Sequence, residues 1–478
     1  MRRSMGRRTA RSAAAMAGRV LNEVVSFVVF TALDLLDFLL CFAYKLLDYA
    51  FEAEWKPCYC SSSAAGGVIT GSGRIVVSEN GGSKIVCLSS SKLHLDDISD
   101  TLYSRPPLLA DLSRRLNSAI TVTNRARVGA GGATTTFTIN STIVQMLQGK
   151  IGGQQTHPVP RWSDCSCKGC AGWCSAPGAG DLLHVACEGN AAAAEDVLFI
   201  HGFISSSAFW TETVFQNFSP AARKRYRFFA VDLLGFGRSP KPAESLYTMR
   251  EHVDMIERSV LERYRVGSFH IVAHSLGSIL AVALAVKHPA AVKSLTLLSP
   301  PYFPVPKGEQ GTQYVLRRVA PRRVWPVIAL GASVACWYEH ISRTVSLIMC
   351  RHHHFWEFLF RLLTRNRIRT FLMEGFFCHT HNAAWHTLHN IICGSAGKID
   401  GYLDAVRETM PSCHVTVIHG RDDDLLPVSC SAAVKSRLPR AHLRVVDGKD
   451  HITIVVGRQR AFARELEQIW AGTNLKAK

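Results

Sequence analysis

A serine flanked by small residues is the first feature of this sequence that could do chemistry. Ser275 lies in the segment Ala273-His-Ser-Leu-Gly277, between an apolar run and a helical pattern from Ser278 to Lys287. A nucleophile elbow needs small residues two positions before and two after the serine, because larger ones would collide with the strand and the helix. Such pentapeptides also arise by chance in ordinary turns, so the other members of a catalytic site must decide the interpretation.

Two segments downstream supply an acid and a base. Asp423 lies in the segment Gly420-Arg-Asp-Asp-Asp-Leu-Leu-Pro427, and His451 ends the segment Asp447-Gly-Lys-Asp-His451. The order serine, aspartate, histidine is the one that an α/β-hydrolase sheet imposes. The spacing Gly-x-x-Asp before a proline selects Asp423, and we interpret the aspartates on either side of it as solvent-facing or capping residues. His451 is one of 20 histidines, and it sits just past the final predicted strand.

An oxyanion hole is expected upstream of the serine. His201-Gly-Phe203 ends a predicted strand, and the backbone N–H groups of Phe203 and Leu276 are the expected donors. The glycine-containing loop from Asp232 to Ser239 would border the same pocket. Ser275 would then attack an ester carbonyl, with a histidine as base and an aspartate orienting it. We expect no metal and no organic cofactor in this chemistry.

Short apolar runs rich in branched residues alternate with helical patterns from about residue 182 onward. This alternation predicts an α/β fold with a mainly parallel sheet covered on both faces, and chemistry at the carboxyl ends of its strands. The predicted strands are 182–187, 197–200, 227–231, 269–273, 292–298 and 414–418.

Composition divides the chain into five expected segments. These are a basic leader with an apolar or amphipathic segment (1–56), an extension with a Cys-rich loop (57–181), a first hydrolase part (182–301), a helical cap (302–412) and a second hydrolase part (413–478). Within the cap, ten arginines from Arg317 to Arg369 are interleaved with aromatic and aliphatic residues from Phe355 to Leu363. This mixture suits a lid that admits acyl chains or lies on a membrane. Alternatively, the aromatics pack on the core and the arginines face solvent.

The leader combines a basic start with an apolar stretch. Arginines from Arg2 to Arg19 precede the first acidic residue, and the stretch from Val24 to Tyr44 is largely apolar, as in a secretory signal or signal anchor. Asp34 and Asp37 would each cost about 2.5 to 3.5 kcal/mol at a bilayer centre, which argues against a simple spanning helix. A helix lying in the membrane interface or a cleaved signal fits better, and a soluble amphipathic helix docked on the body is the alternative.

The charge and the leader indicate location and partners. The chain has 55 basic and 37 acidic residues, and 55 − 37 = +18 indicates an anionic partner, such as a membrane surface or an acidic cell-wall polymer. No nucleic-acid-binding module is recognisable, so no nucleic acid is expected. We expect the secretory pathway, with the protein held at a cell membrane or in the cell wall. Asn140-Ser-Thr142 is an acceptable glycosylation sequon.

A cysteine cluster stands outside the hydrolase pattern. Its members are Cys165, Cys167, Cys170 and Cys174. The spacing lacks the paired form of structural zinc sites, so disulfides are favoured over a metal, and free thiols are the other alternative. The consecutive residues His352 to His354 cannot all point at one ion from a helix, so we interpret them as a solvated or packed run.

Residues from about 182 to 470 resemble the α/β-hydrolase superfamily. The segment Gln148-Gly-Lys-Ile-Gly-Gly-Gln-Gln-Thr-His-Pro-Val-Pro-Arg-Trp162, the Cys-rich turn after it, and residues 197–304 resemble the plant BODYGUARD proteins. Together with the leader, this resemblance covers nearly the whole chain. It implies a probable lysophospholipase or acyl-ester hydrolase linked to cuticle formation, at a membrane or cell wall.

We therefore expect a serine hydrolase acting on acyl (lipid) esters, of the lysophospholipase or cutin-monomer type. A serine at the elbow argues against epoxide hydrolases and haloalkane dehalogenases, which place an aspartate there. One alternative is acyl transfer, in which the same acyl-enzyme is discharged to an alcohol. Another is a non-catalytic receptor or scaffold that keeps the fold.

Overall fold

The computed structural model describes most of the chain from residue 161 onward and several segments before it. The described residues are 2–52, 67–69, 74–79, 82–87, 98–103, 138–139, 161–175, 182–189, 193–242, 245–363, 365 and 370–475. The glycosylation sequon at Asn140 and the side chain of Cys174 lie outside them. The chain forms two units, which we name by their main elements. The large-sheet unit holds residues 96–101, 158–318 and 343–478, and the long-helix unit holds residues 1–95, 102–157 and 319–342.

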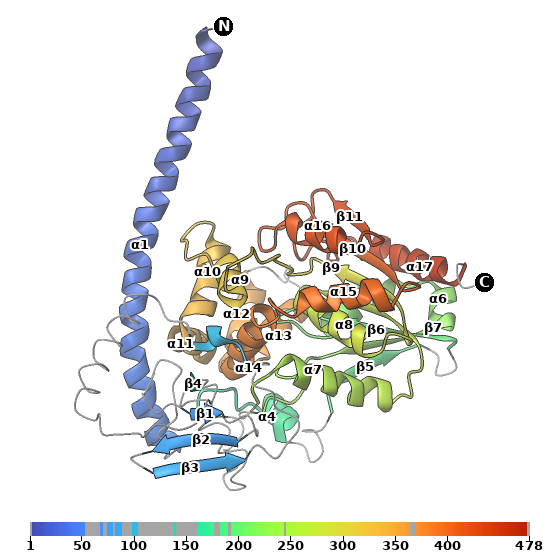
Figure 1. The fold of residues 1–478 in the computed structure, drawn as a ribbon, viewed down its shortest axis with the longest axis horizontal. Coiled ribbons are helices and arrows are strands. Elements are labelled where there is room, and N and C mark those ends of the chain that lie inside the picture. Colours follow the sequence, from blue (N-terminus) through green and yellow to red (C-terminus); the bar gives the residue numbers. More distant parts are fainter. Residues whose placement is uncertain are drawn as a thin grey trace, which may run out of the picture. The chain divides into compact units, whose positions relative to one another are not determined.

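The large-sheet unit is built on seven strands (Figure 1). Their order is β11-β10-β9-β8-β6-β7-β5, and every pairing is parallel except the antiparallel pair of β5 and β7. The strands are β5 (Val185–Glu188), β6 (Glu195–Ile200), β7 (Tyr226–Val231), β8 (Phe269–His274), β9 (Val292–Leu298), β10 (His414–Gly420) and β11 (His442–Val446). The predicted α/β class with a mainly parallel sheet is confirmed.

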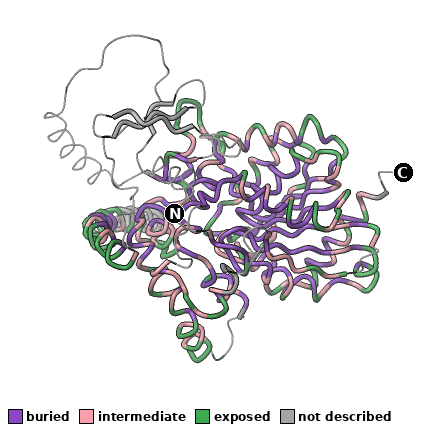
Figure 2. Tube along the Cα trace, turned by 90° about the horizontal axis from the view of Figure 1, so that it is seen from below, coloured by how far each residue is buried: buried purple, intermediate pink, exposed green. Residues whose placement is uncertain are grey.

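Helices cover both faces of this sheet because its strands are apolar on both sides. Val197 and Phe199 of β6 belong to one buried cluster with Trp470 of the last helix. Their neighbour Ile200 points the other way, and its side chain lies next to Gly277 of α8. The last helix and α8 therefore lie on opposite faces, and the buried residues run along the strands between them (Figure 2).

The helices of the large-sheet unit connect its strands and form the region expected as a cap. Before the cap they are η2 (Asp100–Tyr103), α4 (Lys168–Ser175), α5 (Ala208–Thr211), η4 (Phe215–Asn217), α6 (Pro220–Arg225), α7 (Met249–Ile256), η5 (Glu257–Glu262) and α8 (Leu276–Lys287). The later ones are α9 (Gly311–Val319), α11 (Glu339–Met349), α12 (His353–Leu363), α13 (Thr370–Phe377), α14 (His381–Thr387), η6 (Leu388–Cys393), α15 (Ile399–Thr409), α16 (Val428–Arg437) and α17 (Gln459–Leu475). Within residues 302–412, α15 packs on α8 of the hydrolase core. The five-part division of the chain remains a prediction.

The long-helix unit combines α1 (Arg2–Glu52) with residues 319–342, which include α10 (Val327–Trp337) and the start of α11. It also contains a small antiparallel sheet of β1 (Gly67–Ile69), β2 (Arg74–Glu79), β3 (Gly82–Cys87) and β4 (Thr138–Ile139). The two acids of α1 that argue against a simple spanning helix are buried within this unit: Asp34 and Asp37 are 5% and 3% exposed.

Candidate active site

Ser275 lies on a strained turn between β8 and α8. Its backbone has φ 52° and ψ −123°, a conformation that side-chain-bearing residues rarely adopt. The backbone N–H of Ser275 donates to the carbonyl of Leu298 at 2.8 Å, which ties the turn to β9. A Cβ on Gly277 would come within 2.6 Å of the carbonyl oxygen of His201, so only glycine fits two residues after the serine. This is the geometry that the pentapeptide predicts.

Asp423 and His451 meet beyond the carboxyl ends of β10 and β11. Nδ1 of His451 donates to Oδ2 of Asp423 at 2.7 Å, so Nε2 is left to face a reacting group. The other carboxylate oxygen accepts the N–H groups of Leu425 and Leu426 at 3.0 and 2.8 Å. Asp423 is buried and its neighbour Asp422 is exposed. The carboxylate is thus held in one orientation against one imidazole.

A second histidine supports the carboxylate. Nε2 of His419 lies 2.9 Å from the carbonyl of Leu426 and 3.4 Å from Oδ2 of Asp423. Burial on its own would raise the pKa of Asp423, but hydrogen bonds from His419 and His451 outweigh it and hold that pKa well below its usual range. Asp423 therefore stays ionised wherever the protein is folded near neutral pH.

His274 connects the serine turn to the base. Its Nε2–H donates to the backbone carbonyl of His451 at 2.9 Å, and the two ring centroids are 4.6 Å apart. Burial lowers the pKa of His274 to about 3, so its ring is neutral. Among the described residues, no hydrogen bond joins the hydroxyl of Ser275 to His451. Such bonds often tighten only when substrate is bound.

The two expected oxyanion-hole donors lie close to the serine turn. Leu276 is the first residue of α8, and its N–H is one of the helix donors that have no partner inside the helix. Phe203 follows Gly202, where an added Cβ would lie 3.1 Å from Cβ of Ser275. Neither N–H finds an acceptor in the part of the chain that the structure describes. Both are available to an oxyanion.

His201 sets the direction of one of these donors. Its Nε2 accepts the N–H of Leu233 at 2.9 Å, so the proton is on Nδ1, which donates to the carbonyl of Gly202 at 2.7 Å. In a trans peptide the N–H points opposite to the C=O, so the N–H of Phe203 points away from the His201 ring. Burial lowers the pKa of His201, which keeps the ring in this neutral form.

The loop after β7 is organised by one buried carboxylate. Oδ1 of Asp232 accepts the N–H of Ser207 at 2.5 Å, and Oδ2 accepts the N–H of Arg238 at 2.7 Å. Gly237 has φ 51°, and a Cβ there would collide with that carboxylate. A cavity of about 590 Å³ borders the loop. Its lining includes Asp232 and Arg238, but it includes neither the serine nor the histidine of the candidate site.

The sequence analysis named Ser275, Asp423 and His451 as candidates but did not name the side chains that support them. His274, His419 and His201 were not proposed as functional, although each fixes a part of the site. Their only sequence signal is position, because each is the first residue after a predicted strand and lies next to a motif. A histidine in a sequence does not reveal which of its ring nitrogens is hydrogen-bonded.

The chain is similar to known proteins of the α/β-hydrolase fold. The family described as alpha/beta hydrolase fold matches residues 197–323. Three proteins of Arabidopsis thaliana are similar over nearly the whole chain. The chain is 56% identical to probable lysophospholipase BODYGUARD 1 over 465 residues, covering 95% of this chain and 97% of that protein. It is 56% identical to probable lysophospholipase BODYGUARD 3 over 490 residues, covering 96% and 98%. The identity to probable lysophospholipase BODYGUARD 2 is 53% over 477 residues, covering 95% and 98%.

Proposed function

Because this chain belongs to the BODYGUARD family of α/β-hydrolase fold proteins, we propose that it is a serine hydrolase that cleaves acyl esters of lipids at a membrane surface. The observation that carries the proposal is the pairing of a strained serine turn with a buried aspartate-histidine pair at the same edge of the sheet. The substrate class is lysophospholipid-like. The family resemblance implies a role in cuticle formation, and we include that role in the proposal. Activity on esters of cutin monomers would support it.

In this proposal each residue has one task. Ser275 attacks the ester carbonyl while Nε2 of His451 removes its proton and then returns it to the leaving alcohol. Asp423 holds the imidazole and stabilises its cation, for which its depressed pKa suits it. The N–H groups of Phe203 and Leu276 stabilise the negative oxygen of the tetrahedral intermediate. Water then discharges the acyl-enzyme.

The proposed membrane location depends on the long-helix unit. Residues Val20–Glu52 of α1 are long and apolar enough to cross a bilayer. Most of their large apolar side chains are exposed. The exposed ones are Val20, Leu21, Val24, Val25, Phe27, Val28, Leu35, Leu36, Leu39, Phe42, Leu46, Leu47, Tyr49 and Phe51. Moving such a side chain out of water gains about 1.5–3 kcal/mol, so this surface favours lipid.

The acids that argued against a spanning helix are paired inside the unit. Nη2 of Arg322 donates to both oxygens of Asp34 at 3.0 and 3.2 Å, and the hydroxyl of Tyr338 donates to the same carboxylate. Asp37 accepts the backbone N–H groups of His340 and Ile341 at 2.9 and 3.0 Å. The charges therefore face protein, and the cost of placing an isolated acid in lipid does not apply to them.

Residues 319–342 share with α1 a reversed polarity, in which apolar side chains are exposed and charged side chains are paired inside the unit. Trp325, Val327 and Ile328 are exposed, whereas Arg322 and His340 point at the acids of α1. Polar contacts inside and apolar side chains outside are the arrangement of membrane-embedded helices. We propose that α1 and residues 319–342 insert together, which revises the expected interfacial helix into an embedded helix pair.

The cap helix α12 adds a second apolar surface, in the large-sheet unit. Phe355, Phe358, Leu362 and Leu363 are exposed, and their spacing places them on one helical face. Arg361 is exposed beside them. This pattern supports a cap that touches acyl chains and anionic head groups, which was one of the two interpretations of its composition.

The decisive experiment is labelling of the purified full-length chain with a fluorophosphonate probe, with Ser275→Ala as the matched control. We expect the wild type alone to be labelled and to release fatty acid from lysophosphatidylcholine. Absence of labelling in a folded wild-type protein would favour a non-catalytic receptor. Labelling together with acyl transfer to an added alcohol, without hydrolysis, would favour the acyltransferase alternative.

A further inference from the structure

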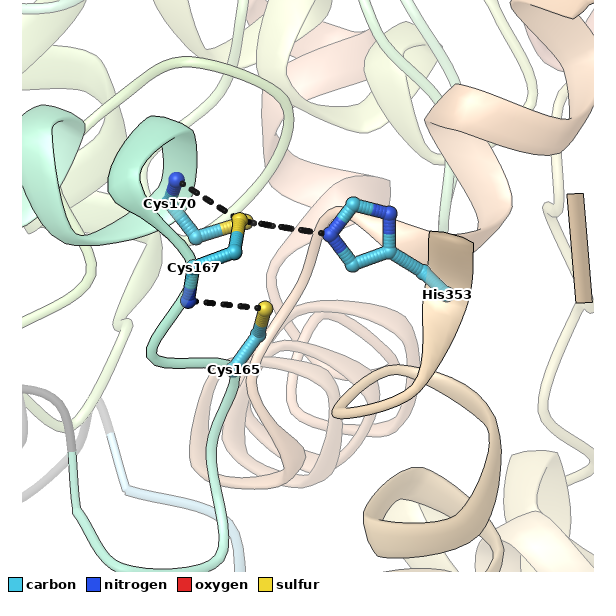
Figure 3. A group of neighbouring side chains, drawn as sticks. All are labelled: Cys165, Cys167, Cys170 and His353. Atoms are coloured by element: carbon cyan, nitrogen blue, oxygen red, sulfur yellow. Dashed lines mark hydrogen bonds between the residues drawn. The ribbon is translucent and has the colours of Figure 1, made fainter. Parts of the chain in front are cut away.

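Three cysteines and one histidine that have no task in the proposed hydrolysis converge in the large-sheet unit. Cys165 and Cys167 lie before α4, Cys170 lies in its first turn, and His353 begins α12, 183 residues beyond Cys170. Figure 3 shows the three sulfur atoms on the side of the imidazole ring that carries Nε2. The four ligand atoms all lie within 4.8 Å of one another.

The distances around the imidazole fit a single small ion. Nε2 of His353 lies 3.5 Å from Sγ of Cys167 and 3.7 Å from Sγ of Cys170. With Zn–S near 2.3 Å and Zn–N near 2.05 Å, the nitrogen-sulfur edge of a tetrahedron is about 3.6 Å. We propose a structural zinc site whose four ligands are Cys165, Cys167, Cys170 and His353.

The four ligands favour zinc over other ions, and they favour a structural site over a catalytic one. Thiolates and an imidazole in tetrahedral geometry suit Zn²⁺ better than the hard cations, which prefer oxygen ligands. Four protein ligands leave no position for water or substrate, so the site is closed. Each thiol loses its proton when the ion binds.

Groups around the ligands are arranged as in metal sites. Nδ1 of His353 lies 3.1 Å from Oε1 of Glu357, one helical turn away. When Nδ1–H donates to this carboxylate, the neutral ring presents the lone pair of Nε2 to the sulfurs. A carboxylate behind a metal-binding histidine is the usual orienting partner. The backbone N–H of Cys167 lies 3.5 Å from Sγ of Cys165, and that of Cys170 lies 3.4 Å from Sγ of Cys167. These donors offset thiolate charge.

A disulfide would explain fewer of the four clustered side chains than a zinc ion does. The sequence favoured disulfides, but Cys165, Cys167 and Cys170 are unbonded thiols in the structure. One disulfide among the three cysteines would leave the third thiol and His353 unused. His353 is 5% exposed, and burying its ring against sulfur is costly unless Nε2 is bonded. The interpretation of residues 352–354 as a solvated or packed run is thus revised for the middle histidine.

Zinc would fasten the segment before the hydrolase core to the cap. The ligands join the α4 segment to the first turn of α12, the helix whose other face carries the exposed Phe355 and Phe358. The zinc site would fix the start of that helix. It is independent of the serine, so loss of zinc and loss of hydrolysis are separable.

The test is metal content and cobalt spectroscopy of the detergent-purified, full-length chain. The protein is prepared with reductant, loaded with Zn²⁺ or Co²⁺ and desalted. We expect about one zinc per chain, because a closed site holds one ion, and the thiolate-to-cobalt charge-transfer band of a tetrahedral site. The wild type should also melt at a higher temperature with zinc than after chelation.

Variants make the assignment falsifiable. Cys170→Ser and His353→Ala should lose more than nine-tenths of the bound zinc, whereas Cys350→Ala, at a buried cysteine outside the four ligands, should keep it. His353→Cys should keep zinc and change the cobalt spectrum. Fluorophosphonate labelling shows that each variant is folded. The proposal is overturned by a labelled wild type that takes up no zinc, by equal loss in Cys350→Ala, or by a disulfide among the three cysteines in protein purified without reductant.

Discussion

The large-sheet unit and α1 of the long-helix unit place their large apolar side chains differently. In the first, Phe199, Trp210 and Trp470 fill the interior. In the second, Asp34 is buried against protein while Phe27 is 70% exposed. Apolar side chains turn inward where the surrounding solvent is water, as in the large-sheet unit. The exposed apolar side chains and paired acids of the long-helix unit are the pattern expected under our proposal that lipid surrounds it.

The largest effect should come from breaking the site of the large-sheet unit. Ser275→Ala, His451→Ala and Asp423→Asn should each lower ester hydrolysis about 10³- to 10⁶-fold, because the three residues act as a unit. Membrane retention, measured by resistance to carbonate extraction, should not change. Asp422→Asn is the control and should stay near wild-type activity. If Asp422→Asn abolished turnover and Asp423→Asn did not, our choice of acid would be wrong.

The next effect tests the reversed polarity of the long-helix unit. Asp34→Leu should destabilise that unit by about 3–5 kcal/mol, because it leaves the partly buried charge of Arg322 without its buried partner. The double variant Asp34→Leu with Arg322→Leu should recover most of this loss. Arg323→Leu, at the exposed neighbouring arginine, is the matched control.

Stability of these variants is measured as protease resistance in liposomes and as the melting temperature in detergent. Hydrolysis of a soluble ester should survive in all of them. If the stability loss of the double variant equalled the sum of the losses of the two single variants, Asp34 and Arg322 would not be coupled.

A third effect concerns an ion pair in the large-sheet unit. Burial would raise the pKa of Glu195, but hydrogen bonds from His270 and Arg225 outweigh burial and lower it to about 2. Since the folded pKa lies below the usual 4.5, Glu195 stabilises the fold above pH 4.5, and this contribution is lost as the pH falls toward 2. A shift of this size corresponds to about 3 kcal/mol.

Glu195→Gln should therefore lower the free energy of unfolding by about 3 kcal/mol at neutral pH. The gap to the wild type should shrink to about half by pH 3. Melting curves between pH 3 and 7 measure it. A gap that stays constant with pH would mean that Glu195 does not contribute through its ionisation.

The smallest effect concerns the exposed face of α12. Phe358→Ser with Leu362→Ser should lower hydrolysis of lipid in vesicles about fivefold, for a loss of ~1 kcal/mol of apolar contact. A short, soluble ester should be hydrolysed at the wild-type rate, because the two side chains lie outside the candidate site. Equal losses on both substrates would indicate a folding defect. No loss on either would favour a cap face that only meets solvent.

The fold could be predicted, and the candidate residues could be named, because their signals are local. Ser275 is recognisable from its two small neighbours, since the backbone turn excludes larger ones. The strands are recognisable because parallel strands buried on both faces are continuous apolar runs. The choice of Asp423 among three consecutive aspartates agrees with its burial and its bond to His451. Its catalytic role remains a prediction.

The rest depends on contacts between distant parts of the chain. Asp34 meets Arg322 across 288 residues, and Cys170 meets His353 across 183. Without its distant histidine, the cysteine cluster shows only a spacing that lacks the paired form of zinc sites, so the sequence favoured disulfides. When Asp34 is considered without its distant arginine, the free-energy cost of placing its charge in a membrane is too high. Both interpretations followed from local rules, and in both cases the partner lies on another element.

Residues 319–342 follow α9 directly and lead into α11, so this part of the long-helix unit, which we propose to be embedded, is continuous in sequence with the cap on both sides. The consequence is one of effective concentration. A short covalent tether holds linked partners at roughly millimolar concentration, whatever their affinity when free. Lipid in the protein's own bilayer would be presented to the site without any need for strong head-group recognition. Lipid in a neighbouring vesicle would have no such advantage, so turnover should follow the surface density of substrate in the host membrane and not its bulk concentration.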